Sequence, residues 1–225
     1  MSAETKIESQ VVSKRRVSDH GEVYTAKREV DAMLNLVKHE CERIDSRFLE
    51  PACGTGNFLS EIFTRKLEVI TLRYSKSQIE FERNAVIAAG SIYGVDILLD
   101  NVLACRERLT NIFAQKYVSL FKKEYQKNCI EVIQFVFSQN ILLGDALTLR
   151  TIDKKGQLAE PIVFAEWAAV NGSMIKRRDF IYSDLVDRAS HREMPLFSDL
   201  DEEAYIPEPI RDYPLTHYLE VGNAT

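Results

Sequence analysis

The chain has 225 residues, of which 45% are apolar and 28% charged, a balance typical of one globular domain with a substantial core. No apolar run approaches the roughly 18 residues that span a membrane, and the N-terminus lacks the apolar segment of a signal peptide. We therefore expect a cytoplasmic protein with no membrane partner. The four cysteines and four histidines show no C-x-x-C pair and no metal-ligand spacing, so we expect reduced thiols and no metal site.

The net charge of -5 is unevenly placed along the chain. Residues 191–225 hold eight acidic and two basic side chains and four of the six prolines, which predicts an acidic, extended tail without a core of its own. The remainder is nearly neutral, so a DNA partner stays open. Its basic clusters at residues 13–16 and 176–178 are either DNA contacts or ordinary solvated charges.

The first 20 residues are polar and predict a flexible arm, which leaves residues 21–190 as the folded domain. Apolar residues at helical spacing predict helices over 27–43, 56–67, 76–90, 98–126, 128–137 and 176–189. Short apolar runs predict strands over 47–52, 91–97, 139–147 and 160–167. Strands that alternate with helices indicate an α/β fold, with a parallel sheet covered by helices on both faces.

Three of the predicted strands end in residues suited to a nucleoside-like ligand. Gly54 and Gly56 allow a tight turn and a close approach to a ligand, next to the free N–H groups of a helix start. Glu50 adds a carboxylate that suits an amino group. Asp96 could accept from ribose hydroxyls and Asp145 from an adenine amine. Each also has a plainer interpretation, because a G-x-G loop can be only a turn and an aspartate can cap a helix.

The spacing around the glycines separates the possible cofactors. A dinucleotide site has G-x-G-x-x-G with an acid about 20 residues further on, whereas Leu59 stands at the third glycine position here. Asp96 follows Gly56 only after 40 residues, and no P-loop lysine is present. The pattern favours S-adenosyl-L-methionine over NAD or ATP.

The segment FLEPACGTGNFL at residues 48–59 resembles motif I of the N6-adenine-specific DNA methyltransferases of restriction-modification systems. IYGVDILLDNVLACRERL resembles their motif II and NILLGDAL their motif III, while GEVYTAKREVDAML is similar to motif X, with Ala26 in place of the usual proline. The likeness covers about residues 20–150, in the order X, I, II, III. It implies a class I S-adenosylmethionine-dependent methyltransferase fold with a Rossmann-like parallel sheet, incomplete in this chain.

The resemblance also implies which residues hold the cofactor. Tyr24 and Thr25 would contact its methionine end, Glu50 to Phe58 would surround it, Asp96 would hold the ribose and Asp145 the adenine. The residues expected at the site are Tyr24, Thr25, Glu50, Pro51, Ala52, Cys53, Gly54, Gly56, Asn57, Phe58, Asp96, Ile97, Asp145 and Ala146.

The family's catalytic motif IV, [DNS]-P-P-[YFW], is absent, since the chain contains no Pro-Pro dipeptide. VFAEWAAVNG stands in its place, where Glu166 could accept from an amine and Trp167 could stack on a flipped base. The alternative interpretation is a strand whose catalytic end has been lost.

The family fold continues past the fourth strand, whereas only one helix and the acidic tail are predicted here. A fourth strand without a neighbour would expose an unpaired edge, which either the tail, through AYIPEPI at residues 204–210, or another chain would cover. We therefore expect a second subunit or self-association. The sequence thus predicts a DNA adenine N6-methyltransferase-type protein that needs a second subunit. The alternatives are a non-catalytic cofactor-binding regulatory or structural subunit, and a degenerate remnant of a longer methyltransferase.

Overall fold

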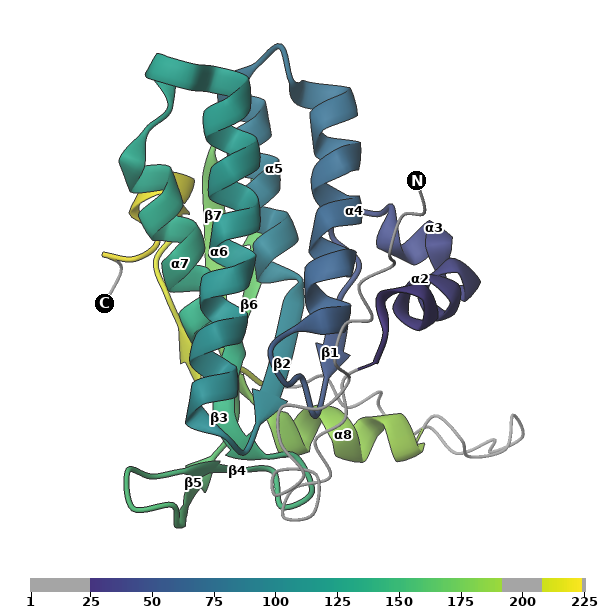
Figure 1. Ribbon diagram of the computed structural model, residues 1–225. Coiled ribbons are helices and arrows are strands. Elements are labelled where there is room, and N and C mark those ends of the chain that lie inside the picture. Colours follow the sequence, from purple (N-terminus) through teal and green to yellow (C-terminus); the bar gives the residue numbers. More distant parts are fainter. Residues whose placement is uncertain (1–24, 192–207, 224–225) are drawn as a thin grey trace, which may run out of the picture.

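The computed structural model describes residues 25–191 and 208–223 (Figure 1). Tyr24, the predicted arm over 1–20 with its basic cluster, and residues 192–207 of the predicted tail lie outside the described residues. Within the described ranges the fold is mixed α/β, and none of the helices combines the length and apolar composition needed to cross a lipid bilayer. The four cysteines are all buried and free.

The first sheet has the order β1-β2-β3-β4-β5. Its first three strands, β1 (Phe48–Glu50), β2 (Ile92–Asp96) and β3 (Ile141–Asp145), are parallel, so their carboxyl ends meet at one edge. The short strands β4 (Arg150–Ile152) and β5 (Leu158–Pro161) continue the sheet antiparallel. The three strands predicted to end in ligand-binding residues are therefore neighbours.

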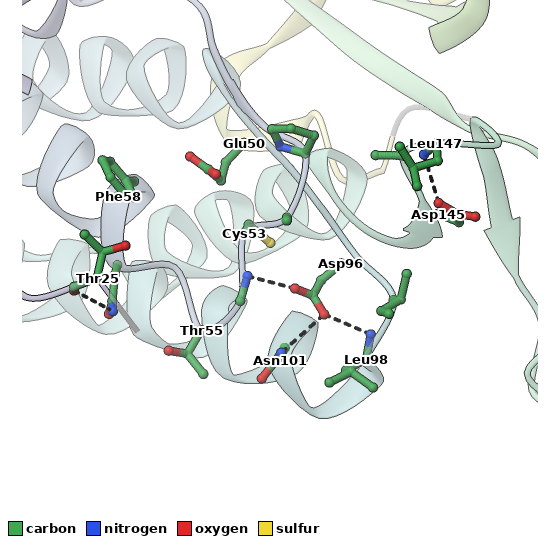
Figure 2. Close-up of a pocket in the computed structure, with 16 residues that line it drawn as sticks. Thr25, Glu50, Cys53, Thr55, Phe58, Asp96, Leu98, Asn101, Asp145 and Leu147 are labelled. Atoms are coloured by element: carbon green, nitrogen blue, oxygen red, sulfur yellow. Dashed lines mark hydrogen bonds between the residues drawn. The ribbon is translucent and has the colours of Figure 1, made fainter. Parts of the chain in front are cut away.

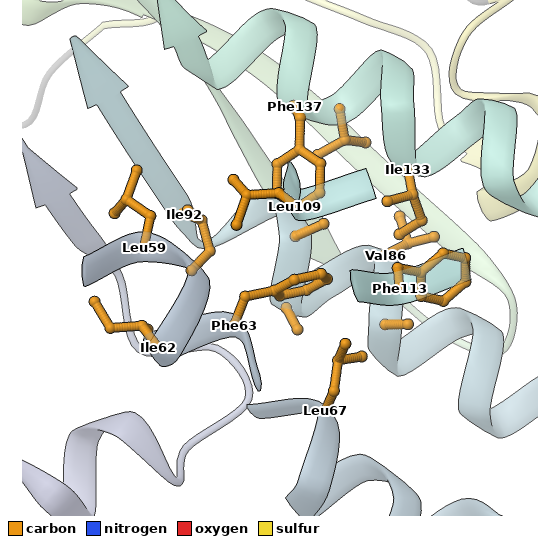
Figure 3. Packing of buried hydrophobic residues seen from close by; sticks show 14 of the residues in the cluster. Leu59, Ile62, Phe63, Leu67, Val86, Ile92, Leu109, Phe113, Ile133 and Phe137 are labelled. Atoms are coloured by element: carbon orange, nitrogen blue, oxygen red, sulfur yellow. The ribbon is translucent and has the colours of Figure 1, made fainter. Parts of the chain in front are cut away.

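Four long helices stand side by side on one side of this sheet (Figure 1): α4 (Asn57–Tyr74), α5 (Gln78–Gly90), α6 (Leu99–Phe121) and α7 (Lys127–Asn140). In each helix most of the buried apolar residues recur three or four positions apart, which places them on one helix face. Phe63 of α4 meets Phe137 of α7 edge to face, with ring centroids 5.2 Å apart (Figure 3), and Phe81 of α5 stacks near Phe113 of α6. The apolar residues that the sequence placed at helical spacing thus form the main hydrophobic core of the protein.

One predicted helix is divided in the structure, and one predicted break between helices is present. The helix expected over 27–43 is two, α2 (Lys27–Leu36) and α3 (Lys38–Cys41), because the backbone leaves helical geometry at Val37. Between α6 and α7 the chain passes through a short 3-10 turn, η1 (Lys122–Glu124). The break that the sequence indicated near residue 127 is therefore present.

The final predicted helix, over 176–189, is wrong in its first part. β6 (Val163–Ala169) and β7 (Met174–Ile181) form an antiparallel hairpin, and α8 (Tyr182–His191) begins only after it. In β7 the buried face carries Ile175, Arg177 and Asp179, and the two charged side chains pair with each other at 2.9 Å between Nε and Oδ1. Because the inward face is polar, the two-residue period of the strand was hidden in the sequence.

The hairpin also corrects the expected arrangement of the sheet faces. Tyr93 of β2 donates from its hydroxyl to the carbonyl of Ala165 at 3.1 Å and packs edge-on against Phe164. The β6–β7 hairpin thus covers the face that helices were expected to cover, and β6 is paired with β7 rather than left alone. Among the described strands, β1, β5 and β6 each pair with a single neighbour, β2, β4 and β7 respectively, and so keep one edge without a strand partner.

The end of the chain is not the coreless tail that its composition predicted. Within residues 208–223, β8 (Arg211–Asp212) and β9 (Thr216–His217) pair with β7, and η2 (Tyr218–Glu220) packs near α7. Tyr218 is only 2% exposed and donates to Glu82 Oε2 at 2.6 Å. Tyr117 bonds to the other oxygen of this buried carboxylate, and burial and this contact raise the pKa of both tyrosines. The segment is therefore anchored to the helical core by a buried polar network.

Replacing Tyr218 with Phe removes one hydrogen bond from a buried carboxylate while it keeps the ring. We expect the free energy of unfolding to fall by about 1–3 kcal/mol in urea denaturation, because the Glu82 oxygen loses a buried donor. The control is Leu215→Ala, a side chain that is 46% exposed and should change stability by about 0.5 kcal/mol or less. Equal stability of the Tyr218→Phe variant and the wild type would contradict the anchoring role.

Candidate ligand pocket at the strand ends

A pocket of about 760 Å³ opens at the carboxyl ends of β1, β2 and β3 (Figure 2). Twelve of the fourteen residues that the sequence predicted for a cofactor line it: Thr25, Glu50, Pro51, Ala52, Cys53, Gly54, Asn57, Phe58, Asp96, Ile97, Asp145 and Ala146. Gly56 is not among the lining residues, and Tyr24 lies outside the described part of the chain. Residues separated by up to 121 positions are thus brought to one cavity.

The two glycines of the loop are needed for different reasons. Both have positive φ, +50° at Gly54 and +83° at Gly56. A Cβ on Gly54 would meet nothing within 4 Å, whereas a Cβ on Gly56 would lie 2.6 Å from the sulfur of Cys105 in α6. Gly54 therefore keeps the pocket wall open. Gly56 instead allows the start of α4 to approach α6 closely. This role differs from the ligand contact that the sequence predicted for Gly56.

Asp96 holds the glycine loop in place. Its Oδ2 accepts from the Gly54 N–H at 2.8 Å, and its Oδ1 accepts from the Leu98 N–H at 2.9 Å and from Asn101 Nδ2 at 3.2 Å (Figure 2). A carboxylate offers about four acceptor positions, and three are used here. Asp96 thus has room for about one further donor, not for the two ribose hydroxyls expected of it, and its larger role is to join the ends of β1 and β2.

Asp145 forms a local turn at the end of β3. Its Oδ1 accepts from the Leu147 N–H at 2.8 Å and its Oδ2 accepts from the Thr148 hydroxyl at 3.1 Å. One acceptor position on each oxygen stays available to a ligand. Both the plainer turn-forming interpretation and the ligand-binding one therefore fit this aspartate.

Of the three described carboxylates that line the pocket, Glu50 is the one without a partner. No hydrogen bond or ion pair from another described residue reaches it, although it is half-buried at the pocket wall between Phe58 and Cys53 (Figure 2). Burial raises the pKa of Glu50 above its usual range. A carboxylate in such a place gains free energy from a cationic ligand, because the ligand's charge replaces lost hydration.

Cys53, beside Glu50, is not a candidate nucleophile. Its hydrogen bond with Cys105 and its burial raise the pKa of the Cys53 thiol well above its usual range, which keeps it protonated at neutral pH.

The N-terminal segment is held at the pocket by Asn57. Its Nδ2 donates to the carbonyl of Thr25 at 3.4 Å, and Arg108 Nη1 donates to its Oδ1 at 2.6 Å. Arg108 thus fixes the amide that holds the N-terminal segment at the pocket.

The two residues expected to be catalytic lie elsewhere. Glu166 on β6 pairs with Arg47 and, at 3.2 Å, with Arg178. Trp167 is 6% exposed and packs edge-on against Phe135 of α7. It also lies close against Gly90, where an added Cβ would be only 2.7 Å from the Trp167 side chain. Because Trp167 is a core residue and neither side chain lines the pocket, the positional assignment of Glu166 and Trp167 as a catalytic pair is wrong for this fold.

Three lining residues were not expected from the sequence: Leu98, Asn101 and Leu147. Thr55, between the two glycines, was covered only by the range Glu50 to Phe58, and Asn101 on the first turn of α6 could have been found from its closeness to Asp96 in the sequence. In the described ranges no group of three or more His, Cys, Asp or Glu side chains is arranged to hold a metal ion.

Comparisons with protein-family models, with curated proteins and with solved structures found no match to this chain. Any assignment of function therefore depends on the residues and geometry of the pocket.

The different roles of the two glycines predict different costs of substitution. Gly56→Ala should lower the free energy of unfolding by about 1–3 kcal/mol more than Gly54→Ala, because it adds overpacking against Cys105 to the backbone strain that both share. Urea denaturation measures both variants.

A double-mutant cycle separates the contact from backbone strain. In a Cys105→Ala background the sulfur is gone, so Gly56→Ala should cost less there than in the wild type, while the cost of Gly54→Ala should be unchanged. Equal costs of Gly56→Ala in both backgrounds would show that the close approach to α6 is not what requires the glycine.

Proposed function

We propose that this chain binds S-adenosyl-L-methionine in the pocket at the ends of β1, β2 and β3. One observation carries the proposal: the described charged residues that line the pocket are all acidic, namely Glu50, Asp96 and Asp145. A phosphate-bearing ligand such as ATP or NAD would meet carboxylates and no lysine or arginine. S-adenosylmethionine has a sulfonium and an ammonium group, and its adenosine part has hydroxyl and amine donors for aspartates.

The residues present fit this ligand. Glu50 is a half-buried carboxylate with a raised pKa and no described partner, which suits a cationic group. Asp145 has acceptor positions left for an amine, and Asp96 has about one left for a hydroxyl. Gly54 leaves the wall open where a side chain would project. The finer assignment, a class I methyltransferase fold of the N6-adenine DNA methyltransferase type, rests on the sequence resemblance together with this site.

S-adenosylmethionine supplies the methyl group in such a reaction, and the protein must place an amine of the DNA base in line with it. Motif IV is absent from the sequence, and Glu166 and Trp167 lie away from the pocket. We therefore assign to this chain the binding of the methyl donor and to a second polypeptide the placement of the base.

Exposed apolar side chains beside the pocket support a second subunit. Leu147 is 95% exposed and Ile97 45%, and both line the pocket, while Leu99 at the start of α6 is 55% exposed. Apolar side chains gathered at the mouth of a site are typical of surfaces that another chain covers. The alternative function is a cofactor-binding subunit without a catalytic partner, and the position of Trp167 in the core favours it over a chain that methylates DNA alone.

Titration calorimetry tests the cofactor assignment. We expect the wild type to bind S-adenosylmethionine, and Glu50→Gln to bind it roughly tenfold to a hundredfold more weakly, because a charge-assisted contact in a half-buried site is lost. Glu107→Gln, an exposed glutamate on α6 outside this pocket, is the matched control and should bind like the wild type.

The pH dependence gives this prediction a second signature. The pKa of Glu50 is raised in the free protein, so affinity should fall as the pH falls through that raised pKa, and Glu50→Gln should lose this dependence. Without ligand the sign for stability is opposite: the raised pKa means that ionised Glu50 costs stability above about pH 4.5, so Glu50→Gln should be more stable at pH 7. Absence of binding by the wild type would overturn the cofactor assignment.

Methyl transfer is a separate prediction. Incubated with tritium-labelled S-adenosylmethionine and unmethylated DNA, the isolated chain should incorporate no label, because the described residues of the pocket include no base-placing pair. A polypeptide that co-purifies with the chain should restore incorporation, and Glu50→Gln should reduce it. Incorporation by the isolated chain would contradict the division of roles between two polypeptides.

A further inference from the structure

A second cavity lies on the hairpin side of β1 and shares no lining residue with the pocket described above. It measures about 550 Å³, and we name it the Arg178 groove after one of the three charged residues that line it. Its apolar walls come from β1, β2, the β6–β7 hairpin and α8, and include Tyr93, Phe164 and Phe180. Leu49 lines the groove while the next residue, Glu50, lines the other pocket, so β1 separates the two cavities.

The walls of the groove are aromatic and rigidly placed. Phe164 contacts Tyr93 on one side and Tyr182 on the other, with ring centroids 5.2 Å and 5.1 Å apart and both pairs edge to face. Burial raises the pKa of Tyr93 to about 12, and its hydroxyl is engaged by the carbonyl of Ala165, so this ring presents an apolar surface. Such walls suit a planar ring that packs against them edge-on or offset.

The charged residues that line the groove have one positive charge in excess. Glu166 is held between two guanidinium groups, of Arg47 and of Arg178, so one carboxylate balances two cations. No other charged residue of the described chain lines this groove. The excess favours an anionic group on whatever binds there.

Arg178 also has a donor that nothing satisfies. Its Nε is buried and has no hydrogen-bond acceptor among the described residues, although Nη2 of the same group bonds to Glu166. An unsatisfied buried donor costs about 1–3 kcal/mol. The side chain is 39% exposed, so the guanidinium keeps room to turn, and a carboxylate in the groove would offer it the two parallel acceptors that its planar fork prefers.

From these observations we infer that the Arg178 groove is a small-molecule site for a planar aromatic anion, an aromatic ring that carries a carboxylate. The ring lies against Phe164 and Phe180, and the carboxylate meets Arg178. The site is separate from the proposed methyl-donor pocket, and its only physical link to it is β1, through the neighbouring residues Leu49 and Glu50. The inference about the Arg178 groove does not depend on the proposed cofactor.

Titration calorimetry of the full chain with 2-naphthoate, in the absence of S-adenosylmethionine, tests the inference, with 2-naphthamide as the neutral ligand of the same shape. We expect the wild type to bind 2-naphthoate at least tenfold more tightly than 2-naphthamide. Arg178→Gln should remove most of that preference. Glu166→Gln should tighten 2-naphthoate binding severalfold, because it removes the carboxylate that competes for the guanidinium groups.

Two further variants control for shape and for folding. Val186→Trp, at a position that lines the groove and is 39% exposed, should fill the groove and abolish binding of both ligands. Arg73→Gln, an exposed arginine outside the groove, should bind like the wild type. Thermal unfolding of each variant shows that it is folded. The inference is overturned if the wild type does not bind 2-naphthoate at millimolar concentration, if both ligands bind equally, or if Arg178→Gln leaves the preference unchanged.

Discussion

The carboxylate of Asp96 joins the parts of the molecule on which the pocket depends. It accepts from the loop after β1, through Gly54, and from the first turn of α6, through Leu98 and Asn101. One side chain at the end of β2 therefore fixes the spacing between two strand ends and a helix start. The fit of Gly56 against Cys105 sets the same spacing from the other side, since α4 can begin there only without a Cβ. The shape of the pocket follows from these two contacts.

The β6–β7 hairpin determines where Glu166 and Trp167 lie and which surface covers the second face of the sheet. Trp167 is buried in the core and Glu166 pairs with two arginines, so neither of these β6 side chains lines the pocket. The same hairpin packs through Phe164 against Tyr93 and leaves a groove between itself and β1. The segment in which the sequence placed a candidate catalytic pair instead lines a second cavity.

The charged residues that line the two cavities favour ligands of opposite charge. The pocket at the strand ends has acidic groups and no described basic one, and Glu50 is left without a partner, which favours a cationic ligand. The Arg178 groove has two arginines around one glutamate and favours an anion. The protein thus offers opposite potentials on the two sides of a three-residue strand, β1, and each potential results from a few side chains at short range.

Local pattern was sufficient for the parallel strands, the four long helices and the pocket residues Glu50, Gly54, Asp96 and Asp145, because strand ends in a parallel sheet must converge and apolar residues at helical spacing must face a core. The other expected lining residues came from the resemblance between motifs. Tertiary structure alone decided the rest. Arg177 and Asp179 face inward because, besides pairing with each other, they bond to Gln139 and Tyr213. Lys66 is fully buried because three backbone carbonyls accept from it, and Tyr218 is a core residue because its hydroxyl donates to the buried Glu82. Composition cannot show such burial, since a charged or polar side chain becomes a core residue only when a partner far away in the sequence removes the cost of its desolvation.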